Sequence, residues 1–388
     1  MSGFGKARLG RVRDVLARHV ELGSAPGAVA LLARGGETVV EAVGAYSRDT
    51  IFRIASMSKP VTAAAAMILV EECTLRLDDP VDELLPELAG RRVLMRVDGP
   101  LEYTVPARRA VTVRDLLTFT FGMGLAFGEP TPISEALDGL AQGMPRPTLP
   151  PPPEEWMRRI GELPLMYQPG ERWLYNTGSD VLGVLIARAS GRSFPDFLAE
   201  RIFGPLGMTD TGFCVRPSEL GRLPAELMTD FATGQTVIFD EPNGQWSLPP
   251  AFPSGAGGLA ATVDDFAAFA AMLRFGGILH GERVLSRPSV SLMTTDQLRA
   301  EVKAVSGLVP GDFDDMGWGL GVSVVTRRTD AAKSVGTYGW DGGLGTSWFN
   351  DPAEDLTAIL LTQRAWTSHR PGAIFRDFWT AAYQAIDD

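Results

Sequence analysis

The chain has 388 residues, of which 45% are hydrophobic and 21% are charged, as in a globular protein that buries a large core. Its net charge of -11 argues against nucleic acid or an anionic membrane surface as a partner. Cys73 and Cys214 are too few for a disulfide framework in so long a chain, and each is expected to fill a small core position.

The chain begins with a predicted helix and a predicted hairpin. Residues 9–22 have the periodicity of an amphipathic helix closed by Gly23, and residues 28–34 and 37–44 are predicted as strands around a tight Gly-Gly turn. The N-terminus has no apolar core of a secretory signal, and no stretch is long and apolar enough to span a bilayer. We therefore expect a cytoplasmic protein without a membrane partner.

The segment Ser56-Met57-Ser58-Lys59 stands at the head of an alanine-rich helical pattern. Pro60 fits the first turn of a helix, so Ser56 is predicted to lie where free N–H groups favour developing negative charge. Lys59 follows one helical turn later on the same face. Lysine is scarce in this chain, which suggests that an ammonium with an adjustable pKa is needed here. Such a pair can make a serine nucleophilic without histidine, although Ser-x-x-Lys also arises by chance.

The middle of the chain is predicted to be mostly helical. Residues 92–110 suggest a small hairpin around Asp98-Gly99-Pro100, and residues 113–117 open a helix. Residues 130–153 are rich in proline and glycine and are predicted as a long surface loop. Residues 180–189 are predicted to be helical, and helix and loop then alternate to about residue 250.

The last third of the chain is predicted to be rich in strands. A helix over residues 263–275 precedes four predicted strands, at 318–326, 335–340, 346–350 and 356–363, and a helix over 375–386 closes the chain. The pattern predicts an α/β (α+β) fold in which an antiparallel sheet is flanked by helices and interrupted by a mostly helical insertion. We expect residues 1–70 and 256–388 to form the sheet domain and residues 71–255 the helical domain, with the active site at their interface.

The usual catalytic alternatives find little support. His19, His280 and His369 have no convincing carboxylate context, and the chain lacks the Gly-x-Ser-x-Gly nucleophile elbow. Metal-ligand spacings such as His-Glu-x-x-His and paired Cys-x-x-Cys are also missing from the sequence. We therefore expect no metal and no cofactor, and a base other than histidine.

Two further segments carry candidate groups. Tyr175 immediately precedes a predicted helix, and a nearby ammonium would lower the pKa of its phenol. It could then take the Ser56 proton and return it to the leaving group, or it could simply pack its ring and hydrogen-bond its hydroxyl. The glycines of residues 338–346 permit close backbone approach, so an N–H there could complete an oxyanion hole with that of Ser56. A glycine-rich hairpin can equally be only a turn.

In order and spacing, Ser56-x-x-Lys59, the Pro-Gly-x-x-Trp-x-Tyr segment ending at Tyr175 and Trp340-x-Gly342 resemble motifs of the serine β-lactamase and penicillin-binding-protein superfamily. Residues 77–80, 116–118 and 253–259 resemble its flanking signatures, and the similarity spans residues 10–386. The resemblance implies a β-lactamase/transpeptidase-like fold. It also implies a site whose catalytic residues are Ser56, Lys59 and Tyr175, and whose oxyanion and substrate contacts come from Ser56, Gly343, Trp340, Gly342, Phe119 and Thr177.

The chain departs from the superfamily pattern at two motifs. Thr177 stands where the asparagine of Tyr-x-Asn is expected, and Trp340-Asp341-Gly342 replaces Lys-Thr-Gly. Replacing that lysine by tryptophan removes a positive charge and supplies an apolar wall, which is similar to the family VIII carboxylesterases. A site with one cation fewer is expected to prefer neutral esters to anionic peptides or lactams.

These features predict a serine hydrolase that cleaves small-molecule carboxylic esters through an acyl-enzyme on Ser56, with Lys59 and Tyr175 sharing the role of base. Alternatives that use the same acyl-enzyme are a β-lactamase or D-amino-acid peptidase acting on lactams or amides, and an acyltransferase. In the acyltransferase, apolar walls such as Phe119 and Trp340 would favour an alcohol over water. The non-enzyme alternative is a penicillin-binding sensory module. The sequence carries no signal for an oligomeric state.

Overall fold

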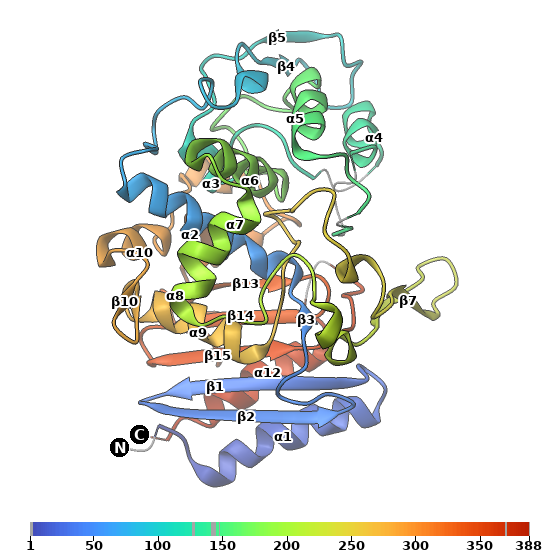
Figure 1. Ribbon diagram of the computed structural model, residues 1–388, viewed down its shortest axis with the longest axis vertical. Coiled ribbons are helices and arrows are strands. Elements are labelled where there is room, and N and C mark those ends of the chain that lie inside the picture. Colours follow the sequence, from blue (N-terminus) through green and yellow to red (C-terminus); the bar gives the residue numbers. More distant parts are fainter. Residues whose placement is uncertain (1–2, 126–128, 141–144, 147, 369–370, 388) are drawn as a thin grey trace.

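The computed structural model describes residues 3–125, 129–140, 145–146, 148–368 and 371–387. Within them, seven strands form one antiparallel sheet in the order β11-β12-β13-β14-β15-β1-β2 (Figure 1). Its strands are β1 (Gly27–Arg34), β2 (Glu37–Gly44), β11 (Met316–Trp318), β12 (Ser323–Val325), β13 (Tyr338–Gly342), β14 (Thr346–Asp351) and β15 (Leu356–Leu361). The N-terminal hairpin therefore extends a sheet that the C-terminal third builds.

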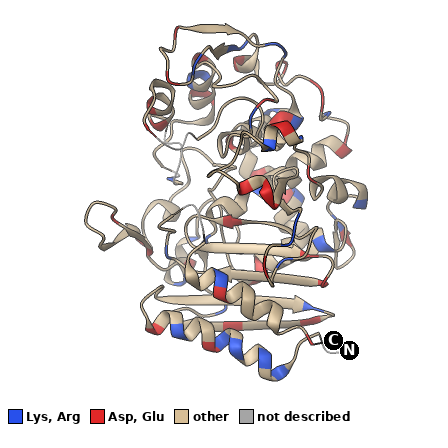
Figure 2. Cartoon of the chain, turned by 180° about the vertical axis from the view of Figure 1, so that it is seen from behind, with Lys and Arg blue, Asp and Glu red and all other residues tan. Residues whose placement is uncertain are grey.

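The sheet is covered on both faces, and its strands β15 and β1 are apolar at consecutive positions. Ala28, Ala30 and Leu32 of β1 pack in the core with α1 (Lys6–Glu21) and α12 (Ala373–Gln384). Val29 and Leu31 point to the opposite face and join the core that contains α2 (Ser58–Glu71) and α9 (Val263–Arg274). Figure 2 shows charged residues mostly on helices and loops, while the strands of the sheet are largely uncharged.

Most of the remaining helices lie on the side of the sheet away from α1 and α12 (Figure 1). The helices are α3 (Val113–Leu117), α4 (Pro132–Asp138), α5 (Pro153–Glu162), α6 (Thr177–Ser190), α7 (Phe194–Leu198), α8 (Gly204–Leu206), α10 (Arg287–Met293) and α11 (Ala300–Lys303). Short antiparallel pairs are formed by β3 (Phe52–Arg53) with β8 (Ala260–Ala261), β4 (Arg92–Leu94) with β5 (Thr104–Pro106), β6 (Glu226–Thr229) with β7 (Thr236–Asp240), and β9 (Ile278–Leu279) with β10 (Glu282–Arg283).

The predicted antiparallel sheet and its flanking helices are confirmed. All strands of the large sheet come from outside residues 71–255, although the proposed division into two domains stays a prediction. Among the described residues, none of the helices combines the length and hydrophobicity needed to cross a bilayer.

Several local predictions were wrong. The expected long loop over residues 130–153 contains α4, which Thr131 caps by accepting a hydrogen bond from the Ser134 N–H at 3.2 Å. The expected single strand over residues 318–326 is a hairpin, because Gly321 adopts φ +78° in the turn between β11 and β12. Cys73 and Cys214 are exposed and are not core residues.

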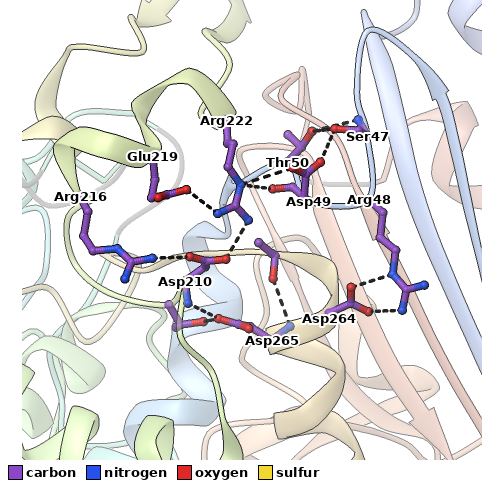
Figure 3. A network of polar contacts seen from close by, with 12 residues as sticks. Ser47, Arg48, Asp49, Thr50, Asp210, Arg216, Glu219, Arg222, Asp264 and Asp265 are labelled. Carbon is purple, nitrogen blue, oxygen red and sulfur yellow. Dashed lines mark hydrogen bonds and ion pairs between the residues drawn. The ribbon is translucent and has the colours of Figure 1, made fainter.

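A polar network fixes the segment that leads from β2 into β3 (Figure 3). Arg222 donates to the Asp49 carbonyl at 2.8 Å and to the Asp210 carboxylate at 2.7 Å. Asp265, near the start of α9, accepts a hydrogen bond from the Asp210 N–H at 2.8 Å. The network thereby joins the approach to Ser56 with the base of α9.

Candidate active site

Ser56 lies in a short 3₁₀ turn (Ala55–Met57) that runs directly into α2. Ala55, immediately before it, adopts a left-handed backbone with φ +45°, a conformation that is costly for a residue with a Cβ and that concentrates at functional sites. Lys59, near the start of α2, donates from Nζ to Ser56 Oγ at 2.9 Å. The helical spacing of the two residues thus produces the direct contact that the sequence predicted.

The Lys59 ammonium is completely buried and held at three points. Besides Ser56, it donates to Asn176 Oδ1 at 2.9 Å and to the Ala256 carbonyl at 2.6 Å. Removal from water lowers the pKa of Lys59 to about 7, and the charge of Asp180 only partly opposes this shift. A substantial share of this amine is therefore unprotonated near neutral pH.

Tyr175 lies over Lys59 from the segment that precedes α6. The Lys59 Nζ is 4.4 Å from the centre of the phenol ring, and Trp340 Nε1 donates to the phenol oxygen at 2.6 Å. The predicted lowering of the Tyr175 pKa is wrong, because burial raises the pKa more strongly than hydrogen bonds with Ser56 and Trp340 lower it. Trp340 is consequently a hydrogen-bond donor to Tyr175 as well as an apolar wall.

Asn176, and not Thr177, supplies the amide that contacts Lys59. Asn176 occupies the N-cap position of α6 with φ +83°, and its side chain makes no capping hydrogen bond. Thr177 is the first residue of that helix and is completely buried. The resemblance to the Tyr-x-Asn motif placed the expected asparagine at position 177, so the role of Asn176 was missed. The useful signal was an asparagine just before a helix, a position where this residue type tolerates unusual backbone geometry.

These groups open into a cavity of about 670 Å³. Its lining includes Ser56, Tyr175, Asn176, Trp340 and Gly343, and also the aromatic side chains Trp173, Phe313 and Trp318.

Phe119 and Gly342, like Thr177, are not part of the described cavity lining. The centre of the Phe119 ring lies 5.9 Å from that of Tyr175, and the two rings pack edge to face. Gly342 allows β13 to approach the turn that carries Ser56, since a Cβ at this position would lie 2.5 Å from the Ile54 carbonyl oxygen.

Neither described histidine lines this cavity. His19 hydrogen-bonds to Asp377 at 2.8 Å between α1 and α12, and His280 occupies the turn between β9 and β10. His369 lies outside the described residues.

Comparison with known proteins assigns this arrangement to a family. The sequence pattern of the beta-lactamase family matches residues 12–376, which is nearly the whole chain. The chain belongs to the beta-lactamase family. The resemblance drawn from the motifs and the predicted β-lactamase-like fold are therefore confirmed.

Relatives in this family include enzymes that act on acyl groups. Esterase EstB of Burkholderia gladioli is 31% identical over 389 residues, which cover 93% of this chain and 91% of that protein. Protein Rv1367c of Mycobacterium tuberculosis is 42% identical over 324 residues, or 81% of this chain and 78% of that protein. The solved structure of EstCE1, described as a hydrolase with promiscuous acyltransferase activity, matches with a TM-score of 0.78 and 26% identity, covering 97% of this chain and 99% of the other. The family, EstB and EstCE1 support chemistry of the serine-hydrolase or acyl-transfer type.

Proposed function

We propose that this protein hydrolyses carboxylic esters through an acyl-enzyme on Ser56. The observation that carries the proposal is the 2.9 Å contact between Lys59 Nζ and Ser56 Oγ, in a buried setting that lowers the pKa of the amine to about 7. An unprotonated Lys59 takes the hydroxyl proton as Ser56 Oγ attacks the ester carbonyl. The ammonium formed in this step is stabilised by Asn176 and by the Ala256 carbonyl.

Tyr175 acts as a neutral phenol in this mechanism. Its raised pKa disfavours a lasting phenolate, and it hydrogen-bonds with Ser56, so it gives its proton to the departing alcohol and is reprotonated by the Lys59 ammonium. Trp340 holds the phenol oxygen at the cavity wall through a 2.6 Å hydrogen bond. Water then attacks the acyl-enzyme, Lys59, now neutral again, accepts its proton, and this proton returns to Ser56 Oγ as the carboxylic acid leaves.

The N–H groups of Ser56 and Gly343 form the proposed oxyanion hole. Both residues line the cavity, and the Gly343 carbonyl accepts a hydrogen bond from the Trp366 N–H at 2.8 Å, which holds the turn between β13 and β14. Loss of one such donor typically lowers kcat by about 10²–10³-fold.

Hydrolysis of 4-nitrophenyl butyrate tests the proposal. Wild-type protein should release nitrophenol, Ser56→Ala should not, and a fluorophosphonate should add its mass to the peptide that contains Ser56. Ester cleavage by Ser56→Ala at the wild-type rate would overturn the assignment. Turnover of a chromogenic cephalosporin without ester turnover would favour a β-lactamase or peptidase. Failure to form an adduct with either a fluorophosphonate or a penicillin would favour a binding or sensory module with a relic site.

An acyltransferase is the second candidate, because aromatic side chains dominate one wall of the cavity. The rings of Trp173 and Trp318 lie 5.4 Å apart, and that of Trp340 lies 4.8 Å from Trp318. Such a wall binds an alcohol better than it binds water. EstCE1 shares the fold and is described with both activities. Added alcohols should yield a new ester at the expense of free acid if transfer competes with hydrolysis, and free acid alone would exclude this candidate.

A further inference from the structure

The cavity that contains Ser56 extends around the edge of β13 to the other face of the sheet. In the described sheet, β12 pairs with β13 only at Gly339 and Tyr338, so the edge of β13 is open from Trp340 onward. Neighbouring side chains on a strand point to opposite faces, yet both Trp340 and Asp341 line the cavity. A molecule bound at Ser56 can therefore also contact the face that carries Asp341.

Lys333 brings an ammonium to this second part of the cavity. It belongs to the segment between β12 and β13 and lines the cavity together with Phe349. Its Nζ lies 3.2 Å from the centre of the Phe349 ring and 4.7 Å from that of Trp379. The two rings hold the cation over their faces, which fixes its position without neutralising its charge.

No described carboxylate lies close enough to Lys333 to form an ion pair, and its Nζ makes no hydrogen bond within the described part of the chain. The acidic groups whose charges act on it are Asp341, Asp330 and Asp315. The Asp341 carboxyl already accepts the Ser347 hydroxyl at 2.5 Å, and burial raises its pKa although the charge of Lys333 opposes this shift. Burial lowers the pKa of Lys333, and a bound anion would oppose this shift by giving the ammonium the partner that it lacks.

We propose that Lys333 binds a carboxylate carried by the substrate. The preferred esters are then half-esters of dicarboxylic acids, or esters whose alcohol bears a carboxylate. The inference rests on the proposed esterase function and names its substrate class. It also reverses the expectation of neutral esters, because the cation missing at Trp340 is supplied to the same cavity from another segment of the chain.

Two matched ester pairs test this proposal. The first is mono-4-nitrophenyl glutarate against 4-nitrophenyl valerate, which places the carboxylate on the acyl group. The second is 4-(butyryloxy)benzoate against its methyl ester, which places it on the alcohol. The measured quantity is the ratio of kcat/KM for the anionic ester to kcat/KM for its neutral partner. In the pair whose carboxylate reaches Lys333, Lys333→Met should lower this ratio by about tenfold or more. A ratio that stays within twofold in both pairs would overturn the proposal.

Lys303→Met is the matched control. Lys303 pairs with Asp296 at 2.7 Å and lines a neighbouring hollow, so the substitution changes net charge equally without reaching this cavity. Its ratio should stay at the wild-type value, and an equal fall would assign the effect to net charge and overturn the proposal. Lys333→Gln replaces the methionine variant if thermal unfolding shows that the latter is not folded.

A binding measurement separates this proposal from the esterase assignment. If wild-type protein cleaves none of the four esters, the esterase function fails, but calorimetry with Ser56→Ala still compares affinity for each anionic ester with that for its neutral partner. The double variant Ser56→Ala/Lys333→Met is compared with Ser56→Ala alone. If it binds an anionic ester more weakly, and the neutral ester is less affected, the carboxylate site is supported. Equal effects on both esters reject it.

Discussion

The protonation of Lys59 is expected to set the pH range of the reaction. Its pKa of about 7 means that the neutral amine, and with it the rate, increases as pH rises through that value. Asn176→Asp would place a carboxylate at the oxygen position 2.9 Å from Nζ, which favours the ammonium and raises its pKa. We predict that the rise of kcat/KM for 4-nitrophenyl butyrate moves to higher pH by about one unit or more.

Thr177→Ser is the control for this pH profile, since it leaves the Asn176 amide in place and should keep the wild-type midpoint. A midpoint for Asn176→Asp that stays unchanged or moves to lower pH would contradict Lys59 as the base.

The hydrogen bond from Trp340 to Tyr175 can be tested separately from the bulk of the indole. Trp340→Phe keeps an aromatic ring at the wall but removes the N–H that lies 2.6 Å from the phenol oxygen. We predict a fall in kcat on the order of tenfold, from the usual loss for a hydrogen bond to a reacting group.

Trp318→Phe offers the comparison, because its indole lines the same cavity but donates to the Leu117 carbonyl. Steady-state kinetics should show a smaller loss for Trp318→Phe. Equal losses in the two variants would mean that ring volume, and not the hydrogen bond, matters.

Site residues that are close together in the sequence could be predicted, whereas those that meet only through folding could not. Ser56 and Lys59 are joined by one turn of helix, so their spacing was sufficient. Tyr175 came from the family motif, because nothing local connects it with α2. Lys333 was not predicted, since its place depends on how the segment before β13 folds against Phe349. The direction of the Tyr175 pKa was also wrong, because sequence shows the neighbouring cation but not the burial that outweighs it.

At the scale of elements, the turn between β13 and β14 depends on two glycines with different surroundings. A Cβ on Gly342 would lie 2.1 Å from Thr346 Oγ1 and 2.5 Å from the Ile54 carbonyl oxygen, whereas a Cβ on Gly343 would meet nothing within 4 Å. We predict that Gly342→Ala lowers the free energy of unfolding by about 1–3 kcal/mol or more, as overpacking does. Gly343→Ala should change it by only about 0.5 kcal/mol.

Urea denaturation of the two glycine variants gives this comparison directly. Equal stability of both variants would show that β13 can move away from the turn that carries Ser56.

Strongly periodic elements were predicted well, and capped or broken ones were not. β1 and β15 have apolar runs bounded by turns, which is enough to define a buried strand. Helix α4 was missed because its proline was interpreted as a loop signal, although Thr131 followed by Pro132 is a typical start of a helix. The β6–β7 hairpin was missed because β7 is largely exposed and lacks a buried face.

At the scale of the whole molecule, Arg53 joins segments that are distant in sequence. Its guanidinium is fully buried, contacts Asp240 at 2.6 Å and donates to the Pro224 carbonyl at 2.7 Å and to Gln363 Oε1 at 3.1 Å. β3, the β6–β7 hairpin and the end of β15 are thereby held together just ahead of Ser56. Arg48, on the preceding loop, forms a 2.7 Å pair with Asp264 in which both side chains are about half exposed (Figure 3).

The Arg53–Asp240 and Arg48–Asp264 ion pairs have similar distances, but the first is buried and the second is exposed. Comparing them therefore tests how much a buried ion pair contributes to the stability of the fold. Removing one partner of a buried pair leaves an uncompensated charge, so Arg53→Met should lower the free energy of unfolding by about 3–5 kcal/mol. An exposed pair is screened by water and gains little, so Arg48→Met should cost less than about 1 kcal/mol. Urea denaturation at neutral pH measures both. Similar losses would mean that Asp240 finds another partner once Arg53 is gone, and that the packing around β3, rather than this ion pair, keeps the turn of Ser56 in place.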